Sequence, residues 1–259
     1  MRFQGKRVLV TGATRGIGAA CAKAFLAEGA RVAINGRTQG SVDRAIAEIG
    51  AMAEIGANAF PAPGDVSTVA GCEAAVTAAL AALGGLDVLV NNAGVFFRGL
   101  IEETDEAAWD RVMDSNVKSV AFCTRFALPA LRASKGNIVN IASESGIAGY
   151  PETTAYCASK GAVIALTRAM AMEVAPDIRV NALCPGVIDT DMAREGFAID
   201  EDIEAGLQAQ RDSYPLKRIG TPQETAAAVL FLAAPEAAFI NGVALPQEGG
   251  ATVGNWRGV

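Results

Sequence analysis

The residue types available for acid–base chemistry are restricted, because this chain of 259 residues contains no histidine. Ser-His-Asp triads, Cys-His dyads and histidine-ligated zinc sites are therefore excluded within the chain. A proton-transferring side chain must be a tyrosine, lysine, aspartate, glutamate or cysteine. Tyr156 and Lys160 stand out, because they are four residues apart in a helical pattern and project from the same face.

A lysine beside a tyrosine changes what the phenol can do. A free phenol has a pKa of about 10 and is a poor base at neutral pH. A nearby ammonium stabilises the phenolate and lowers that pKa, and one unit corresponds to about 1.4 kcal/mol. We therefore expect Lys160 to lower the pKa of Tyr156. Tyr156 would then give a proton to a carbonyl oxygen during reduction, or take one from an alcohol during oxidation.

Ser143 follows a predicted strand at residues 137–142. Strands of a parallel sheet open onto a ligand crevice at their carboxyl ends, so this hydroxyl could hydrogen-bond a substrate oxygen as charge develops. A Tyr-Lys pair on a helix is common, and so is a serine in a loop. Their combination on two sides of one crevice is what makes the pattern specific.

A glycine-rich stretch at residues 11–18 lies between the first predicted strand and the first predicted helix. Gly12, Gly16 and Gly18 let the backbone turn tightly, approach a pyrophosphate and pack the helix on the sheet. The helix N-terminus adds free N–H groups and a partial positive charge. Glycines also make ordinary turns, but this position between strand and helix favours a dinucleotide site.

The end of the second predicted strand bears on the choice of dinucleotide. An NAD site usually has an acidic residue there, which accepts the ribose hydroxyls. Here Asn35 and Gly36 are followed by Arg37, and Arg15 lies in the glycine loop. Arginine suits a 2′-phosphate because its planar fork donates two hydrogen bonds at once. We therefore predict NADP, with NAD as the alternative if both arginines are simply solvated.

Apolar runs alternate with helical patterns along the chain. The predicted strands lie at residues 7–10, 32–35, 59–61, 87–91, 137–142, 178–183 and 242–245. The predicted helices lie at residues 15–28, from about 41, after 67 with Ser67 or Thr68 as N-cap, about 105–134, 154–174 and 221–234. This alternation predicts an α/β fold: a doubly wound, Rossmann-like parallel sheet with helices on both faces, in one domain over residues 1–259.

Two segments depart from this rhythm. Residues 48–51 recur as residues 54–57, an echo that we interpret as a lengthened helix end or loop. Residues 188–214 are polar and acid-rich and lack a strand pattern. Long connections of that kind often cover a binding site, so we predict a substrate lid there.

Composition narrows the functional class. The net charge is −6 without a basic stripe, so we expect no nucleic-acid partner. The apolar stretches are too short to span a bilayer, and the N-terminal residues lead into a strand without an apolar leader, so we expect a cytoplasmic protein with no membrane contact. The five cysteines are scattered, which favours reduced, buried thiols and no metal site.

These motifs together resemble the short-chain dehydrogenase/reductase family over nearly the whole chain. Residues 11–18 are similar to its TGxxxGxG loop, and residues 91–94 to its NNAG segment. Ser143, Tyr156 and Lys160 resemble its serine and YxxxK motif, and Asn116 its helix asparagine, which helps hold a water in the proton path. The resemblance implies a catalytic tetrad of Asn116, Ser143, Tyr156 and Lys160, with Lys160 also binding the nicotinamide ribose.

The resemblance also implies a cofactor site and an assembly. The implied cofactor residues are Gly12, Thr14, Arg15, Gly16, Ile17, Gly18, Arg37, Asp65, Val66, Asn92, Ala93, Gly94, Tyr156, Lys160, Pro185, Gly186, Val187, Ile188 and Thr190. The family typically forms tetramers through the helices that carry Asn116 and Tyr156. Residues 241–250 depart from the usual Thr-Gly and Asp-Gly-Gly, which bears on assembly and not on chemistry.

The substrate is less well defined by the sequence. We expect Ser145, Tyr150 and Phe97 to contact a small molecule, which could be a sugar, a polyol, a 3-oxoacyl thioester or a cyclic ketone. Glu144 could bind a hydroxylated substrate or be solvated. The alternatives are a non-catalytic NADP-binding or scaffolding protein on the same fold, an NAD-preferring sugar or polyol dehydrogenase, and a nicotinamide-dependent dehydratase or epimerase.

Overall fold

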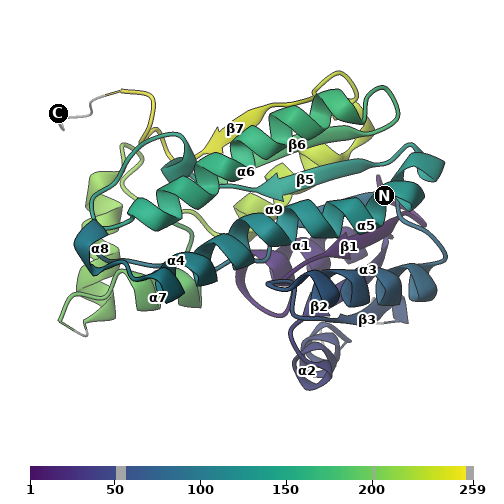
Figure 1. Ribbon diagram of the computed structural model, residues 1–259, viewed down its shortest axis with the longest axis horizontal. Helices are drawn as coiled ribbons and strands as arrows, with labels where there is room; N and C mark the ends of the chain where they lie inside the picture. Colours follow the sequence, from purple (N-terminus) through teal and green to yellow (C-terminus); the bar gives the residue numbers. More distant parts are fainter. Residues whose placement is uncertain (51–56, 201, 255–259) are drawn as a thin grey trace.

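The computed structural model of the protein describes residues 1–50, 57–200 and 202–254. These residues form one sheet of seven parallel strands in the order β3-β2-β1-β4-β5-β6-β7 (Figure 1). The strands are β1 (Arg7–Val10), β2 (Arg31–Gly36), β3 (Ala59–Pro63), β4 (Val88–Asn91), β5 (Asn137–Ile141), β6 (Arg179–Pro185) and β7 (Ala244–Gln247). The strand order reverses direction between β1 and β4, which confirms the doubly wound, Rossmann-like fold.

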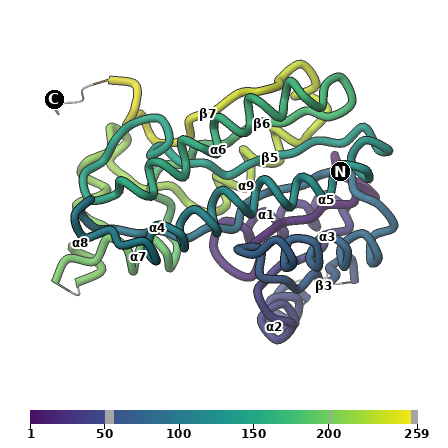
Figure 2. The backbone as a smooth tube through the Cα atoms, viewed as in Figure 1, coloured from purple at the N-terminus to yellow at the C-terminus, as the bar shows by residue number. Residues whose placement is uncertain are grey.

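Helices cover both faces of the sheet. On one face lie α1 (Gly16–Ala27), α2 (Gln39–Gly50) and α9 (Pro222–Ala233); on the other lie α3 (Val69–Leu83), α5 (Ser119–Ser134) and α6 (Thr154–Glu173). In Figure 1, α5 and α6 cross in front of the strands, whereas α1 and α9 lie behind them. Three shorter helices, α4 (Glu106–Met113), α7 (Asp191–Gly196) and α8 (Ile203–Ser213), gather at the end of the molecule opposite the N-terminus (Figure 2).

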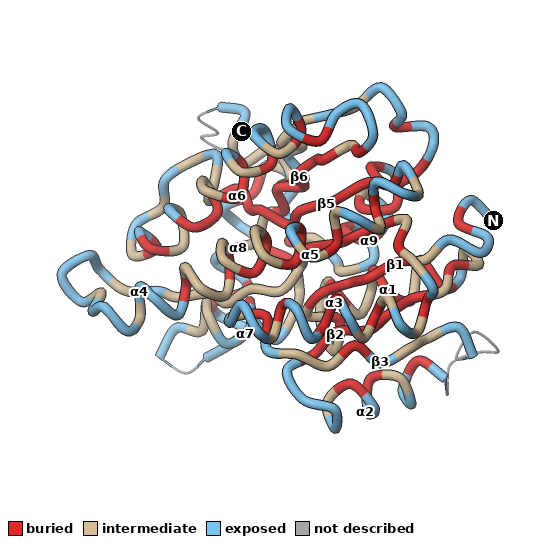
Figure 3. Tube along the Cα trace, turned by 45° about the vertical axis from the view of Figure 1, so that its right-hand side comes forward, coloured by how far each residue is buried: buried red, intermediate tan, exposed pale blue. Residues whose placement is uncertain are grey.

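The strands are buried on both faces, as their apolar sequences predict. Val8 and Val10 pack into the layer that contains α1 and α9, whereas Leu9, between them, packs into the layer that contains α3 and α5. β2 repeats this alternation with Ile34 on the first side and Ala33 on the second. Figure 3 shows buried residues running along the central strands. Side chains of one strand therefore hold both helical layers in place.

The long helix predicted at residues 105–134 is not regular throughout. A π-helical turn at Asp114–Lys118 separates α4 from α5. π-turns insert extra backbone into an α-helix and occur often at functional sites. Asn116 lies in this turn and is buried. The helix predicted over residues 105–134 is thus present along its length, but it contains a π-turn at the place where a site residue was expected.

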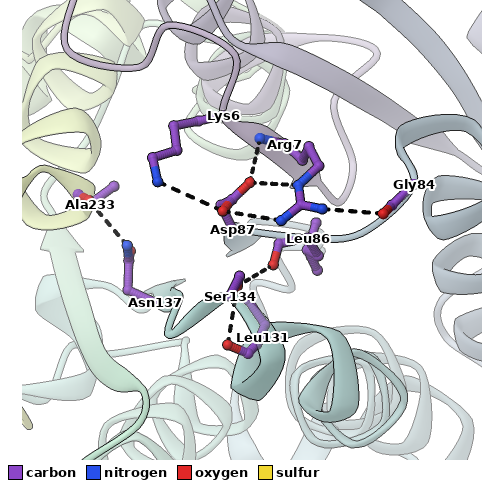
Figure 4. Close-up of polar contacts among 9 residues, drawn as sticks. All are labelled: Lys6, Arg7, Gly84, Leu86, Asp87, Leu131, Ser134, Asn137 and Ala233. Atoms are coloured by element: carbon purple, nitrogen blue, oxygen red, sulfur yellow. Dashed lines mark hydrogen bonds and ion pairs between the residues drawn. The ribbon is translucent and has the colours of Figure 1, made fainter.

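A closed polar network occupies the amino end of the central strands (Figure 4). The carboxylate of Asp87 accepts hydrogen bonds from the Arg7 backbone at 2.9 Å and from its Nε at 2.7 Å, and lies 3.7 Å from the Lys6 Nζ. Nearby, the Asn137 side chain donates to the Ala233 carbonyl at 3.0 Å. These contacts link β1, β4, β5 and the end of α9 at the amino ends of the strands.

The two segments that depart from the strand–helix alternation differ in how much of each the structure describes. Of the repeated segment, residues 51–56 lie outside the described residues. The connection at residues 188–214 contains α7 and α8 on either side of the undescribed residue 201. The segment predicted as a lid is therefore largely helical.

Among the described helices, none combines the length and apolar character that crossing a bilayer requires.

Candidate active site

A cavity of about 580 Å³ opens at the carboxyl ends of the strands. It is lined by eighteen of the predicted cofactor residues: Gly12, Thr14, Arg15, Gly16, Ile17, Arg37, Asp65, Val66, Asn92, Ala93, Gly94, Tyr156, Lys160, Pro185, Gly186, Val187, Ile188 and Thr190. Gly18 is the exception. A side chain there would collide with the Gly12 carbonyl oxygen, so this glycine permits the close packing of α1 on the loop. The cavity is therefore continuous from the glycine loop to the tyrosine.

The glycine loop has the shape that a diphosphate requires. Gly12 has a φ of +60°, and a Cβ added to it would lie 2.9 Å from the Cα of Ala93. The loop leads directly into α1, whose first turn has no acidic side chain. Free N–H groups and the positive end of a helix favour an anion at this position. The residues present therefore fit a dinucleotide with its pyrophosphate over the loop.

Asn35 is a support for this loop that the sequence analysis missed. It is buried at the end of β2, where its Oδ1 accepts a hydrogen bond from the Gly12 N–H at 3.1 Å. Its Nδ2 donates to the carbonyls of Ala62 at 2.8 Å and Gly64 at 3.1 Å. One amide thus holds the glycine loop and β3 in register. The sequence did contain a signal for this role, since Asn35 is a polar residue within an otherwise apolar strand.

Ser143 and Tyr156 meet across the cavity wall. Ser143 lies at the end of β5, where its Oγ accepts a hydrogen bond from the Ser145 N–H at 3.1 Å. Tyr156 lies in the first turn of α6, and Ser143 is close enough to influence its ionisation. Lys160 is one turn further along α6, with its Nζ 5.6 Å from the centre of the Tyr156 ring. The three predicted catalytic side chains therefore line one wall.

Asn116 stands behind this wall and does not line the cavity. Its Oδ1 accepts from the Val95 N–H at 2.8 Å, and its Nδ2 donates to the Val95 carbonyl at 3.0 Å. The same Nδ2 also donates to Ser159 Oγ at 3.0 Å, and Ser159 donates to the carbonyl of Tyr156 at 2.7 Å. Asn116 thus joins the segment after β4 to the helix that carries the tyrosine.

Burial dominates the ionisation of the tyrosine and the lysine. It raises the pKa of Tyr156 to about 12, against a smaller opposite effect of the hydrogen bond with Ser143. It lowers the pKa of Lys160 to about 8, and the Nζ donates to the Ile141 carbonyl at 2.9 Å. The expected lowering of the Tyr156 pKa by Lys160 is therefore not found. Desolvation disfavours the charged form of each side chain.

The chain is similar to known enzymes along its length. A family model described as Enoyl-(Acyl carrier protein) reductase matches residues 12–252. The 2-(S)-hydroxypropyl-CoM dehydrogenase 3 of Xanthobacter autotrophicus is 41% identical over 97% of this chain and 98% of its own. The meso-2,3-butanediol dehydrogenase of Serratia marcescens is 40% identical over 97% of this chain and 96% of its own. The ligand-free aldohexose dehydrogenase of Thermoplasma acidophilum has a TM-score of 0.86 and 33% identity, and covers 99% of this chain and 97% of its own.

The chain belongs to the short-chain dehydrogenase/reductase family. It is an enzyme of the class that acts on CH–OH and C=O groups, and it uses a nicotinamide dinucleotide. This agrees with the cavity, which joins the glycine loop to the half-buried Tyr156.

In this short-chain dehydrogenase/reductase the substrate end of the cavity is aromatic. Phe96 packs edge-on against Tyr156, with ring centres 5.0 Å apart, and against Phe197, at 5.3 Å. Phe197 follows α7, so the predicted lid touches the catalytic wall. Of the three predicted substrate residues, only Ser145 is among the described residues that line the cavity; Phe97 and Tyr150 are not.

Glu144 is the cavity residue that the sequence analysis left undecided. It follows Ser143 and is only 6% exposed, so it is not a solvated surface carboxylate. Its Oε1 accepts a hydrogen bond from the hydroxyl of Tyr214 at 2.5 Å. No pattern in the sequence connects these two residues, which are 70 positions apart.

Proposed function

We propose that this protein is an NADP(H)-dependent oxidoreductase that moves a hydride between nicotinamide and a carbonyl or secondary alcohol. The observation that carries the proposal is that Ser143, Tyr156 and Lys160 line the same cavity as the glycine loop. A binding protein without chemistry would not require a half-buried phenol and a buried lysine one helical turn apart. We therefore favour catalysis over the non-catalytic alternative.

The proposed roles follow from the positions of the side chains. Nicotinamide supplies or accepts the hydride when it is bound. In the direction of reduction, the hydroxyl of Ser143 donates a hydrogen bond to the substrate oxygen as negative charge develops there. Tyr156 gives its proton to that oxygen and becomes a phenolate, which the Lys160 ammonium stabilises. In oxidation the phenolate takes the proton back from the alcohol.

Tyr156→Phe tests the catalytic role directly. The variant keeps the ring that packs against Phe96 but has no proton to give. We expect turnover to fall roughly 10²- to 10⁴-fold, the usual contribution of a positioned acid or base. Cofactor affinity, measured by fluorescence titration, should change little. Full activity in the variant would remove Tyr156 from the mechanism, and saturable binding without turnover by the unaltered protein would favour the non-catalytic alternative.

The preference for NADP rests on two arginines. Arg15 and Arg37 both line the cavity, and the segment after β2 contains no carboxylate before Asp43. Arg15 also lies 3.9 Å from Asp191, an exposed contact that a 2′-phosphate could replace. We expect NADPH to bind more tightly than NADH, and Arg37→Asp to narrow or reverse the difference. Equal affinities in the unaltered protein would instead favour the NAD-preferring alternative.

The substrate class is proposed from the wall and from the similar proteins. Their names describe hydroxylated small molecules: a hydroxypropyl-CoM, a butanediol and an aldohexose. Phe96 and Phe197 give the cavity an apolar wall beside Tyr156, which suits the carbon skeleton of a small substrate. We propose a small secondary alcohol or the corresponding ketone. A turnover screen of diols, sugars, cyclic ketones and 3-oxoacyl thioesters with both cofactors tests this choice.

We further propose a cytoplasmic homotetramer. All five cysteines are free thiols, as is typical of a reducing compartment. Aromatic side chains are exposed on two helices, Trp109 on α4 and Phe231 on α9, where a second copy could cover them. Light scattering of the purified protein measures the assembly, and a monomer at micromolar concentration would contradict it.

A further inference from the structure

A buried carboxyl group lies between the catalytic serine and the segment that covers the cavity. Glu144 follows Ser143 directly, and its Oε1 accepts the hydrogen bond from Tyr214 at 2.5 Å. Its Oε2 is buried and has no hydrogen-bond partner among the described residues. Carboxylates buried in this way normally have several donors or a cation, so the incomplete set requires an explanation.

Tyr214 connects this carboxyl to the cofactor side of the cavity. The residue is buried at the end of α8, and its hydroxyl accepts a hydrogen bond from the Val187 N–H at 2.8 Å while it donates to Glu144. Gly186 leaves room for the contact, since a Cβ there would lie 2.9 Å from the Tyr214 hydroxyl and 3.1 Å from Glu144 Oε2. One phenol therefore links the serine loop, the turn after β6 and the end of α8.

The other groups that face Glu144 are phenols and carboxylates. Tyr150, from the loop before α6, and Glu248, from the segment after β7, both lie close enough to influence its ionisation. The Tyr156 hydroxyl, from α6, is close enough to be influenced by its charge. No described lysine or arginine forms an ion pair with Glu144. Its negative charge is thus stabilised only by neutral donors.

We propose that Glu144 is a positioning residue that holds the turn after β6 against the catalytic serine loop through Tyr214. The inference deepens the proposed function, because that turn lines the proposed cofactor cavity. Glu144 does not touch the reacting atoms. It acts through the Tyr214 hydroxyl on the Val187 N–H, at the wall where the nicotinamide would lie.

The electrostatics agree with this geometry. Burial raises the pKa of Glu144 to about 7, partly opposed by the hydrogen bond from Tyr214. Burial disfavours the charged carboxylate, and the hydrogen bond from Tyr214 favours it. The contact with Tyr214 therefore matters most when Glu144 is charged.

Hydrogen–deuterium exchange tests the positioning without any turnover. Tyr214→Phe removes the acceptor of the Val187 N–H, so we expect exchange in residues 186–190 to become roughly tenfold faster. Glu144→Ala leaves the Tyr214 hydroxyl without its acceptor and should also speed exchange in these residues, whereas Glu144→Gln keeps an oxygen that can accept from Tyr214 and should change it much less. Glu173→Gln, the same substitution on the exposed end of α6, is the control. Unchanged exchange in Tyr214→Phe would overturn the positioning role.

Steady-state kinetics test whether this positioning matters to the reaction. The turn after β6 lines the cavity where the nicotinamide would lie, so Tyr214→Phe should raise the KM for the cofactor more than it lowers kcat. An unchanged KM in Tyr214→Phe would overturn the positioning role. Absence of turnover in the unaltered protein would contradict the proposed function alone, because the exchange experiment does not depend on it.

Discussion

At the scale of single residues, burial is the main influence on the titratable groups of the cavity. It raises the pKa values of Tyr156 and Glu144 and lowers that of Lys160. All three shifts favour the neutral form, so the wall carries less charge at neutral pH than its sequence suggests. A site of this kind responds strongly to a charge that develops during the reaction, because little water screens it.

The stability of the protein should report the raised pKa of Glu144. Its folded-state pKa of about 7 lies above the ordinary value of 4.5. The contribution of the carboxyl to stability is therefore complete below the ordinary value and is lost as the pH rises through about 7. Relative to Glu144→Gln, the free energy of unfolding of the unaltered protein should fall by roughly 3 kcal/mol between about pH 4 and pH 8.

Urea unfolding of both proteins across this range measures the difference. Glu173→Gln, with an exposed carboxyl, should follow the unaltered protein at every pH. If the gap between Glu144→Gln and the unaltered protein stayed constant with pH, the carboxyl would not titrate near neutrality, and the raised pKa would be wrong.

Residue spacing predicted some of the site and could not predict the rest. Tyr156 and Lys160 are recognisable because one helical turn separates them, and Ser143 because it ends a strand. The partnership of Glu144 with Tyr214 depends on the folded path of the chain between them. The lowering of the Tyr156 pKa was predicted from charge alone, without the burial that outweighs it.

At the scale of elements, periodicity predicted the strands and most helices, because apolar strands between longer amphipathic segments permit few other folds. It could not reveal the π-turn at Asp114–Lys118, since one extra residue hardly disturbs a helical pattern. The side-chain hydrogen bonds of Asn116 to Val95 and Ser159 accompany that turn. They join segments that a local pattern does not connect.

The start of α3 offers a matched test of an element boundary. The sequence left Ser67 and Thr68 as alternative N-caps; in the structure Thr68 Oγ1 accepts from the Gly71 N–H at 3.0 Å, whereas Ser67 donates to Asp65. Thr68→Ala should therefore destabilise the protein by about 1 kcal/mol. Ser67→Ala should have a smaller effect, measured by the same thermal or urea unfolding. A larger loss in Ser67→Ala would exchange the two roles.

At the scale of the whole molecule, the two ends of the strands have different roles. The cavity lies at the carboxyl ends, whereas the polar network around Asp87 links the amino ends of the central strands (Figure 4). Such a division lets a loop vary at one edge while the strands stay in register at the other. Changes at the amino edge should consequently affect stability and leave cofactor binding intact.

Asp87→Asn tests this separation. Burial alone would raise the pKa of Asp87, but the hydrogen bonds from Arg7 outweigh it and hold the pKa below the ordinary 3.8. Its contribution to stability is therefore present above that ordinary value and is lost as the pH falls through the lower folded value. At neutral pH the variant should lose about 1–2 kcal/mol, since two charged partners lose their attraction at a partly buried site. NADPH affinity should stay the same.

Glu28→Gln, which breaks the exposed ion pair with Arg2, is the control and should lower the free energy of unfolding much less in the same urea titration. A drop in cofactor affinity equal to the loss of stability would mean that the two edges are coupled and that the network also holds the cavity open.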